Sequence, residues 1–122
     1  MFFPVSGWFA AFLLTLVIEL PIVAWLLRRG EPDLRRRVAL AVFANLVTHP
    51  AVWYVFSQLF EVGTVEYTLA AEGWAVLGEA LFYVVAIRGL GVNRAIGVAV
   101  LANGASFAVG RIVDAIRPEL FR

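Results

Sequence analysis

Four apolar stretches, each long enough to cross a lipid bilayer, follow one another along this chain. They cover about residues 7–27, 38–60, 68–87 and 94–114. A helix needs about 20 predominantly apolar residues to cross the hydrocarbon core, and short connections place consecutive helices side by side. The sequence therefore predicts an all-α polytopic membrane protein. We expect an antiparallel up-down four-helix transmembrane bundle that forms a single domain over residues 1–122.

The composition is typical of a chain surrounded by lipid. Hydrophobic residues make up 62% of the 122 residues and charged residues 16%, whereas a typical soluble domain is about 45–50% apolar and about 25% charged. The lipid bilayer is thus the first expected partner. The chain has no cysteine and a net charge of +1. These numbers exclude disulfides and thiolate metal sites, and they leave no basic face for binding nucleic acid.

All ten basic residues are arginines, and their distribution predicts the orientation in the membrane. The side that holds the second connection and the C-terminus has only Arg111, Arg117 and Arg122. Connections rich in arginine stay in the cytoplasm. We therefore expect a multi-pass protein of a bacterial inner (plasma) membrane, with both termini outside and the arginine-rich connections in the cytoplasm. The first connection, about residues 28–37, is expected to hold Arg28, Arg29, Arg35, Arg36 and Arg37, and the third, about residues 88–93, is expected to hold Arg88 and Arg94 at its ends.

Ionisable side chains inside the apolar stretches are the most informative feature for function. Glu19, His49 and Glu79 each lie about 11 or 12 residues from the outer end of their stretch, which at about 1.5 Å per residue is one level near mid-membrane. Such groups are expensive in lipid and usually face a bundle interior or a cavity. We expect these three side chains to form one site that binds a metal or another cation.

Further polar residues are expected to support this site. Asn45 precedes His49 by four residues, so both share one side of a helix, and Asn103 lies at the same depth as the ionisable residues. The amides would either orient ligands or only join helices by hydrogen bonds. Glu72 lies nearer the outer end, at the approach to the site. The full supporting set is Asn45, Asn103, Glu72, Thr48, Ser106 and Tyr83.

Two prolines lie beside polar residues of the predicted site. Pro21 follows Glu19 by two residues, and Pro50 follows His49 directly. A proline inside a helix removes a backbone hydrogen bond and tends to kink the helix, which would open a cavity there. Membrane helices also tolerate proline without such a role.

Three functions fit these residues. In the first, Glu19, His49 and Glu79 hold a divalent metal (zinc, iron or manganese) with an open position for water or substrate, and the site is catalytic or only binds. In the second, a buried carboxylate binds a proton and a cationic substrate in turn, and the chain acts as a small transporter or channel in a homo-oligomer. In the third, the bundle is a non-catalytic module that packs against a larger membrane protein.

A line of small residues marks the last apolar stretch. Ala102, Ser106 and Gly110 are spaced by four, and small residues at this spacing let helices approach closely in lipid. This face packs either inside the bundle or between the protomers of a homo-oligomer.

The chain shares features with three groups of membrane proteins. Its size, its helix number and Glu19 resemble the small multidrug resistance transporters, although a second carboxyl such as Glu79 departs from that family. Residues 103–110 are similar to a segment of the dual-topology fluoride channels, whereas the arginine bias is not. The widest resemblance is to a class of small bacterial four-helix integral membrane proteins without an assigned reaction. It rests on residues 19–21, 45–50, 72–79 and 103–106, and it implies the architecture and the polar site.

Overall fold

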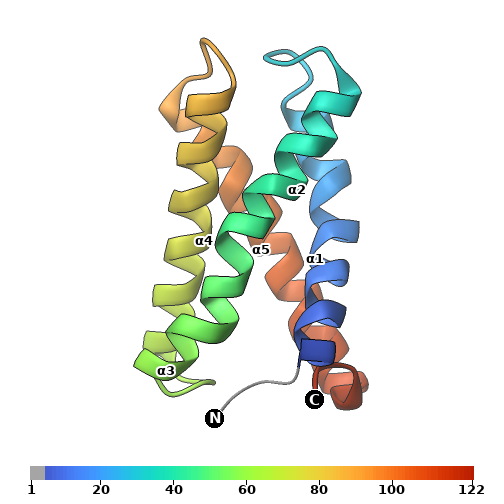
Figure 1. Ribbon diagram of the computed structural model, residues 1–122, viewed down its shortest axis with the longest axis vertical. Coiled ribbons are helices and arrows are strands. Elements are labelled where there is room, and N and C mark those ends of the chain that lie inside the picture. The colour runs from blue at the N-terminus through green and yellow to red at the C-terminus, as the bar shows by residue number, and fades with distance from the viewer. Residues whose placement is uncertain (1–4) are drawn as a thin grey trace.

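The computed structural model describes residues 5–122, which form helices and no β-strand (Figure 1). Four long helices make up most of the chain: α1 (Val5–Leu26), α2 (Leu34–Ala51), α4 (Val65–Ala86) and α5 (Val92–Ile116). Three short elements complete it: the π-helical turn η1 (Val52–Phe56), the one-turn helix α3 (Ser57–Leu59) and the 3-10 helix η2 (Pro118–Phe121). Because η1 and α3 continue α2 directly, the chain has four helical rods, as predicted.

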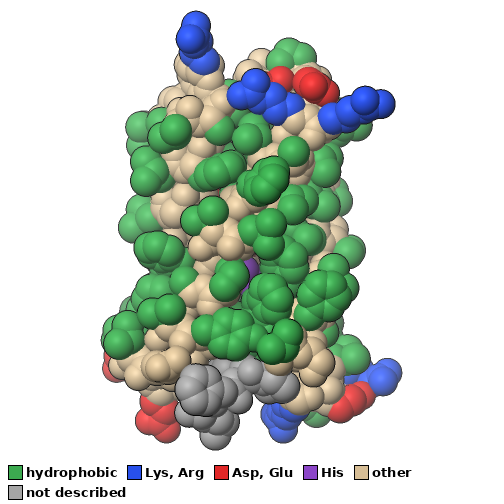
Figure 2. Space-filling view, viewed as in Figure 1, with side chains coloured by type: hydrophobic (Ala, Val, Ile, Leu, Met, Phe, Trp, Pro, Cys, Tyr) green, Lys and Arg blue, Asp and Glu red, His purple; other side chains and the backbone are tan. Residues whose placement is uncertain are grey.

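Each of these rods is long and apolar enough to cross a membrane. Large apolar side chains point away from the bundle, and the exposed fractions of Val17, Leu69 and Val85 are 70%, 69% and 79%. Figure 2 shows apolar side chains over the middle of the molecule and charged ones at its two ends. Apolar surface of this extent needs an apolar solvent. The prediction of an all-α chain with four helices long and apolar enough to cross a membrane is thus confirmed.

The long helices follow one another around the bundle in the order α1, α2, α4, α5. α1 packs against α2 and α5, and α4 packs against the same two helices. In Figure 1 the connections 27–33 and 87–91 lie together at one end, which we call the arginine end. The connection 60–64 and η2 lie at the opposite end, which we call the pocket end.

α2 and α4 begin earlier than their apolar stretches indicate, at Leu34 and Val65, and a polar residue caps each of them. Asp33 Oδ1 accepts a hydrogen bond from the N–H of Arg35 at 3.0 Å, and Thr64 Oγ1 accepts one from the N–H of Tyr67 at 3.2 Å. Such caps satisfy the free N–H groups of a first helical turn. Arg35, Arg36 and Arg37 therefore belong to the first turn of α2, and the prediction that they lie in the connection is wrong.

An apolar core fills the arginine-end half of the bundle. It contains Val23 of α1 and Tyr83 of α4, together with Leu27 and Ile87, which directly follow these two helices, all at most 2% exposed. Buried alanines from α2 and α5 complete it and let the helices approach closely. These alanines are Ala41, Ala44, Ala95, Ala99 and Ala102. The core therefore closes this end of the bundle.

The two membrane prolines have different effects. α1 continues through Pro21 without a break, whereas the π-helical turn η1 begins two residues after Pro50. π-helical turns are frequent at functional sites. Trp74 Nε1 donates to the carbonyl of Thr48 at 3.2 Å, and Tyr67 Oη donates to the first carbonyl of η1 at 3.1 Å. These two bonds from α4 stabilise the irregular segment.

Candidate functional site

Glu19 of α1 is fully buried and is held by neutral groups from two other helices. Its Oε2 accepts a hydrogen bond from Asn45 Nδ2 of α2 at 2.9 Å, and its Oε1 lies 2.6 Å from Ser106 Oγ of α5. Asn45 Nδ2 also donates to the carbonyl of Ala41 at 3.0 Å, which fixes the orientation of the amide. Glu19 therefore joins α1 to both of its neighbours.

Glu79 of α4 is also fully buried and is held in the same way. Its Oε2 accepts a hydrogen bond from Asn103 Nδ2 of α5 at 2.7 Å, and its Oε1 lies 3.2 Å from Thr48 Oγ1 of α2. The α2 partners of the two glutamates, Asn45 and Thr48, are one helical turn apart, about 5 Å along the axis. Glu19 and Glu79 therefore share one level in the bundle, and we call them the carboxyl pair.

Neither carboxylate of this pair has a cationic partner among residues 5–122. The ion pairs within these residues are Arg36–Glu31 at 3.2 Å and Arg117–Glu119, which lie at the ends of the bundle. The hydrogen bond from Arg117 lowers the pKa of the exposed Glu119 carboxyl. An unpaired charge is costly in a protein interior within a membrane. Each buried carboxyl must therefore take up a proton or bind a cation.

The hydroxyl partners suit a carboxyl that gains and loses a proton. Thr48 Oγ1 lies 3.1 Å from the carbonyl of Ala44, and Ser106 Oγ lies 3.1 Å from the carbonyl of Asn103. A hydroxyl carries one proton and two lone pairs. It can donate to an ionised carboxyl, or it can accept from a protonated one while it donates to the backbone. The hydrogen bonds are thus satisfied in both protonation states.

A pocket of about 370 Å³ leads from the pocket end to Glu79 of the carboxyl pair. Its deep end is lined by Glu79 and by the amide and hydroxyl donors of both carboxyls. Apolar side chains such as Leu14, Trp53 and Phe107 form much of its wall. Small-molecule sites are typically apolar pockets of this size class with a few convergent polar groups.

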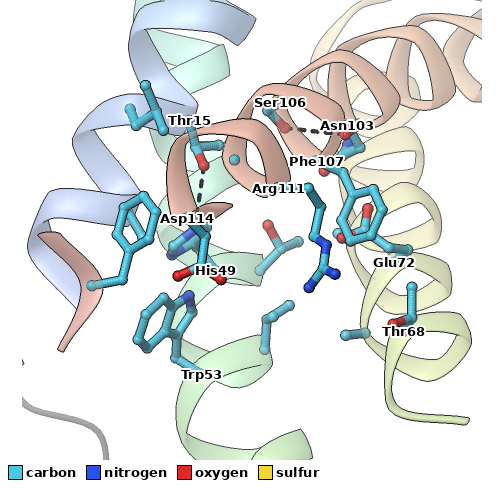
Figure 3. A pocket seen from close by; sticks show the side chains of 18 of the residues that line it. Thr15, His49, Trp53, Thr68, Glu72, Asn103, Ser106, Phe107, Arg111 and Asp114 are labelled. Atoms are coloured by element: carbon cyan, nitrogen blue, oxygen red, sulfur yellow. Dashed lines mark hydrogen bonds between the residues drawn. The ribbon is translucent and has the colours of Figure 1, made fainter. Parts of the chain in front are cut away.

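Charged residues line the outer part of the pocket. Glu72, Arg111 and Asp114 belong to this lining. Figure 3 shows the Arg111 side chain extending into the pocket between Asp114 on one side and Glu72 on the other. Glu72 precedes Glu79 by seven residues on α4, about 10 Å along the axis. The mouth therefore carries both signs of charge, whereas the deep end carries carboxyls without a basic side chain.

His49 lines the same pocket but is not hydrogen-bonded to either carboxyl. Its Nε2 lies 3.4 Å from Thr15 Oγ1 (Figure 3), and its ring contacts Phe12 and Trp53 at centroid distances of 5.5 and 6.4 Å. The structure thus holds Glu19 and Glu79 through separate amide and hydroxyl donors, one from α2 and one from α5 for each carboxyl. It turns His49 toward α1 instead.

The described part of the chain contains no group of three or more His, Cys, Asp or Glu residues that could hold a metal ion. The hypothesis of zinc, iron or manganese at Glu19, His49 and Glu79 therefore stays a prediction. Metal analysis of the purified protein beside the His49→Ala variant tests it, and equally low metal in both contradicts it.

The remaining predicted residues lie inside the bundle. Tyr83 is fully buried in the apolar core, and within residues 5–122 its hydroxyl has no hydrogen-bond partner. Ala102 is fully buried, Ser106 contacts Glu19, and Gly110 lines the pocket. The small-residue face of α5 therefore packs within the monomer. Association into a homo-oligomer stays a prediction.

Thr15, Arg111 and Asp114 are polar pocket residues that the predicted site did not include. Thr15 contacts His49, and Arg111 and Asp114 line the mouth. Arg111 and Asp114 are three residues apart near the end of the fourth apolar stretch, so both project from one helix face. That spacing is a signal that the sequence does contain.

Comparison of the chain with protein-family models, with curated proteins and with solved structures gives no match. The function is therefore inferred from the chemistry of the pocket.

Proposed function

We propose that this protein binds a small organic cation at the deep end of the pocket, with the carboxyl pair as its counter-charge. The observation that supports this most strongly is that Glu19 and Glu79 are fully buried and contact only amide and hydroxyl groups. A cation that reaches them gains strong electrostatic attraction, because the low dielectric of the surroundings screens little. Protons compete with the cation for the same oxygens.

The pocket walls favour an organic cation over a bare metal ion. Trp53 and Phe107 line the pocket beside its other apolar side chains, and cations bind well over aromatic rings. An ammonium or guanidinium group would lie near Glu79, and the rest of the ligand would lie along the apolar wall. Arg111 and the acidic residues at the mouth would contact any further polar group.

In the membrane, the four helices would form an antiparallel up-down bundle with the arginine end in the cytoplasm. The supporting observation is the position of Arg28, Arg36, Arg88 and Arg94 at or beside the connections of that end, because arginine-rich connections stay in the cytoplasm. Both termini and the mouth of the pocket would then face the outside of a bacterial inner membrane.

Equilibrium binding to the protein in lipid nanodiscs tests this function. The probes are benzyltrimethylammonium and guanidinium, which keep their charge at every pH used, and tryptophan fluorescence with calorimetry reports binding. We expect Glu79→Gln to weaken binding about tenfold or more, which corresponds to about 1.4 kcal/mol. Glu66→Gln is the matched control, because it removes an exposed carboxyl from the same helix.

Uncharged benzyl alcohol separates electrostatic binding from apolar partition, because its interaction should not depend on Glu79. The proposal is contradicted if neither cation binds, or if both bind equally well to the wild type and to Glu79→Gln.

A further inference from the structure

Two segments on different helices carry the same pattern of buried residues. Residues 41–48 of α2 read AVFANLVT, and residues 99–106 of α5 read AVLANGAS. The first two alanines and the asparagine of each segment are buried, and each segment ends in a hydroxyl residue that contacts the carboxyl pair. The first half of the chain (α1 to α3) and the second half (α4 and α5) therefore contribute equivalent groups to the site.

The hydrogen bonds repeat with the sequence. Asn45 binds Glu19 across 26 residues within the first half, and Asn103 binds Glu79 across 24 residues within the second. Thr48 of the first half contacts Glu79 of the second, whereas Ser106 of the second half contacts Glu19 of the first. Each carboxyl thus takes its amide from its own half and its hydroxyl from the other half.

A second pair of equivalent bonds joins the halves at the arginine end. Arg36 of α2 donates to the carbonyl of Ala86 in α4 at 2.9 Å, and Arg94 of α5 donates to the carbonyl of Leu26 in α1 at 3.0 Å. In each case an arginine near the start of one half's second long helix binds the end of the other half's first helix. We call these two contacts the arginine clamps.

The chain is therefore a two-helix unit present twice, with an approximate two-fold axis along the bundle. The pocket lies on this axis, because equivalent positions line it from both sides. Examples are Ala11 with Ala71, Thr15 with Ala75, and Trp53 with Arg111. The closed end also contains equivalent positions, because Val23 and Tyr83, and likewise Leu27 and Ile87, belong to the same core.

We propose that the two halves rock against each other and that the protein thereby carries the bound cation across the membrane in exchange for protons. This inference rests on the proposed function. Substrate sites of transporters built from internal repeats lie near mid-membrane at the interface of the repeats, which is where the carboxyl pair and the pocket lie. The pocket is open at one end and sealed by paired apolar residues at the other, as one state of such a cycle requires.

The polar contacts between the halves would break and re-form without large cost. A cation that occupies a carboxyl competes with the hydroxyl from the other half, and the arginine clamps are single bonds near the surface that water can replace. The exchange of the cation for a proton is electroneutral. One monovalent cation displaces one proton at the pocket end, and one proton from the arginine side displaces that cation after the halves have moved.

Flux into proteoliposomes, measured beside binding, tests this inference. Radiolabelled benzyltrimethylammonium and guanidinium are offered outside vesicles whose lumen is more acidic, so that outward proton movement drives uptake. We expect uptake several-fold above that of Glu79→Gln vesicles, and loss of this uptake when the pH gradient is removed. Arg35→Gln, which leaves both arginine clamps intact, should transport like the wild type.

The two proposals fail in different ways. Binding without uptake driven by the pH gradient overturns the transport inference and leaves the proposed function standing. Absence of binding in the same preparation overturns the proposed function itself. Binding together with Glu79-dependent, gradient-driven uptake supports both.

Discussion

The hydroxyl of Thr48 on α2 lies 3.2 Å from Oε1 of Glu79 on α4, so one half of the chain contacts the carboxyl of the other half. The equivalent contact of Ser106 with Glu19 runs in the opposite direction. Because each half supplies a hydroxyl to the carboxyl of the other half, both carboxyls lie at the interface of the two halves. Any change in their charge therefore acts directly on how the halves pack.

Gly78→Ala should disturb the contact between Thr48 and Glu79. A Cβ at Gly78 would lie 2.9 Å from Thr48 Cγ2, and overpacking of a well-packed interior costs about 1–3 kcal/mol. Gly73→Ala is the matched control, since a Cβ there meets nothing within 4 Å. We expect unfolding titrations in mixed micelles to show a loss for Gly78→Ala and none for Gly73→Ala. Equal stability of the two variants would mean that this approach of α2 and α4 is not tight.

Asn103→Ala and Asn45→Ala should destabilise the protein by similar amounts. Each removes the amide that donates to one buried carboxyl, and a buried acceptor left without a partner costs about 1–3 kcal/mol. Asn93→Ala, at an exposed position of α5, should have little effect in the same unfolding assay. A loss confined to only one of the two buried positions would argue against equivalent halves.

Cation binding should weaken as the pH falls, because protons and the cation compete for the carboxyl pair. Other titratable groups face the same pocket, namely His49, Tyr67, Glu72 and Asp114, together with the permanently charged Arg111 and Arg122. His49→Gln should therefore keep the pH dependence, whereas Glu79→Gln should reduce it. Calorimetric titrations at a series of pH values measure this. A pH dependence that follows His49 instead would contradict the competition.

Removal of both arginine clamps should open the arginine end. The chain has no cysteine, so Ala44→Cys introduces a single thiol at a fully buried position of the core. In nanodiscs we expect a water-soluble thiol reagent to label it several-fold faster in the Arg36→Gln/Arg94→Gln background. Arg35→Gln serves as the control background. Unchanged labelling in the clamp variant would show that the apolar core alone closes this end.

The sequence predicts the four spans well, because length and hydropathy are properties of single segments. The caps at Asp33 and Thr64 account for the earlier starts of α2 and α4. Depth along a helix is also readable from the sequence, and the two carboxyls that it groups, Glu19 and Glu79, are both fully buried.

Rotation and pairing of side chains are harder to predict. His49 shares a depth with the carboxyl pair, but its ring turns toward Thr15, and no spacing rule specifies that rotation. The repeat could have been found from the AVFANLVT and AVLANGAS segments. It is inconspicuous because α1 and α4 share few residues beyond the equivalent Glu19 and Glu79.

Proton release on cation binding is the most direct test of whether protons and the cation compete for the carboxyl pair. The wild-type protein in weakly buffered nanodiscs is titrated with benzyltrimethylammonium at a pH where the carboxyl pair still holds a proton, and the pH of the solution is recorded. We predict release of about one proton per bound monovalent cation, as charge balance in a low-dielectric site requires, and no release from Glu79→Gln. Cation binding without proton release, or the same release from Glu79→Gln, would contradict competition between the proton and the cation at this carboxyl.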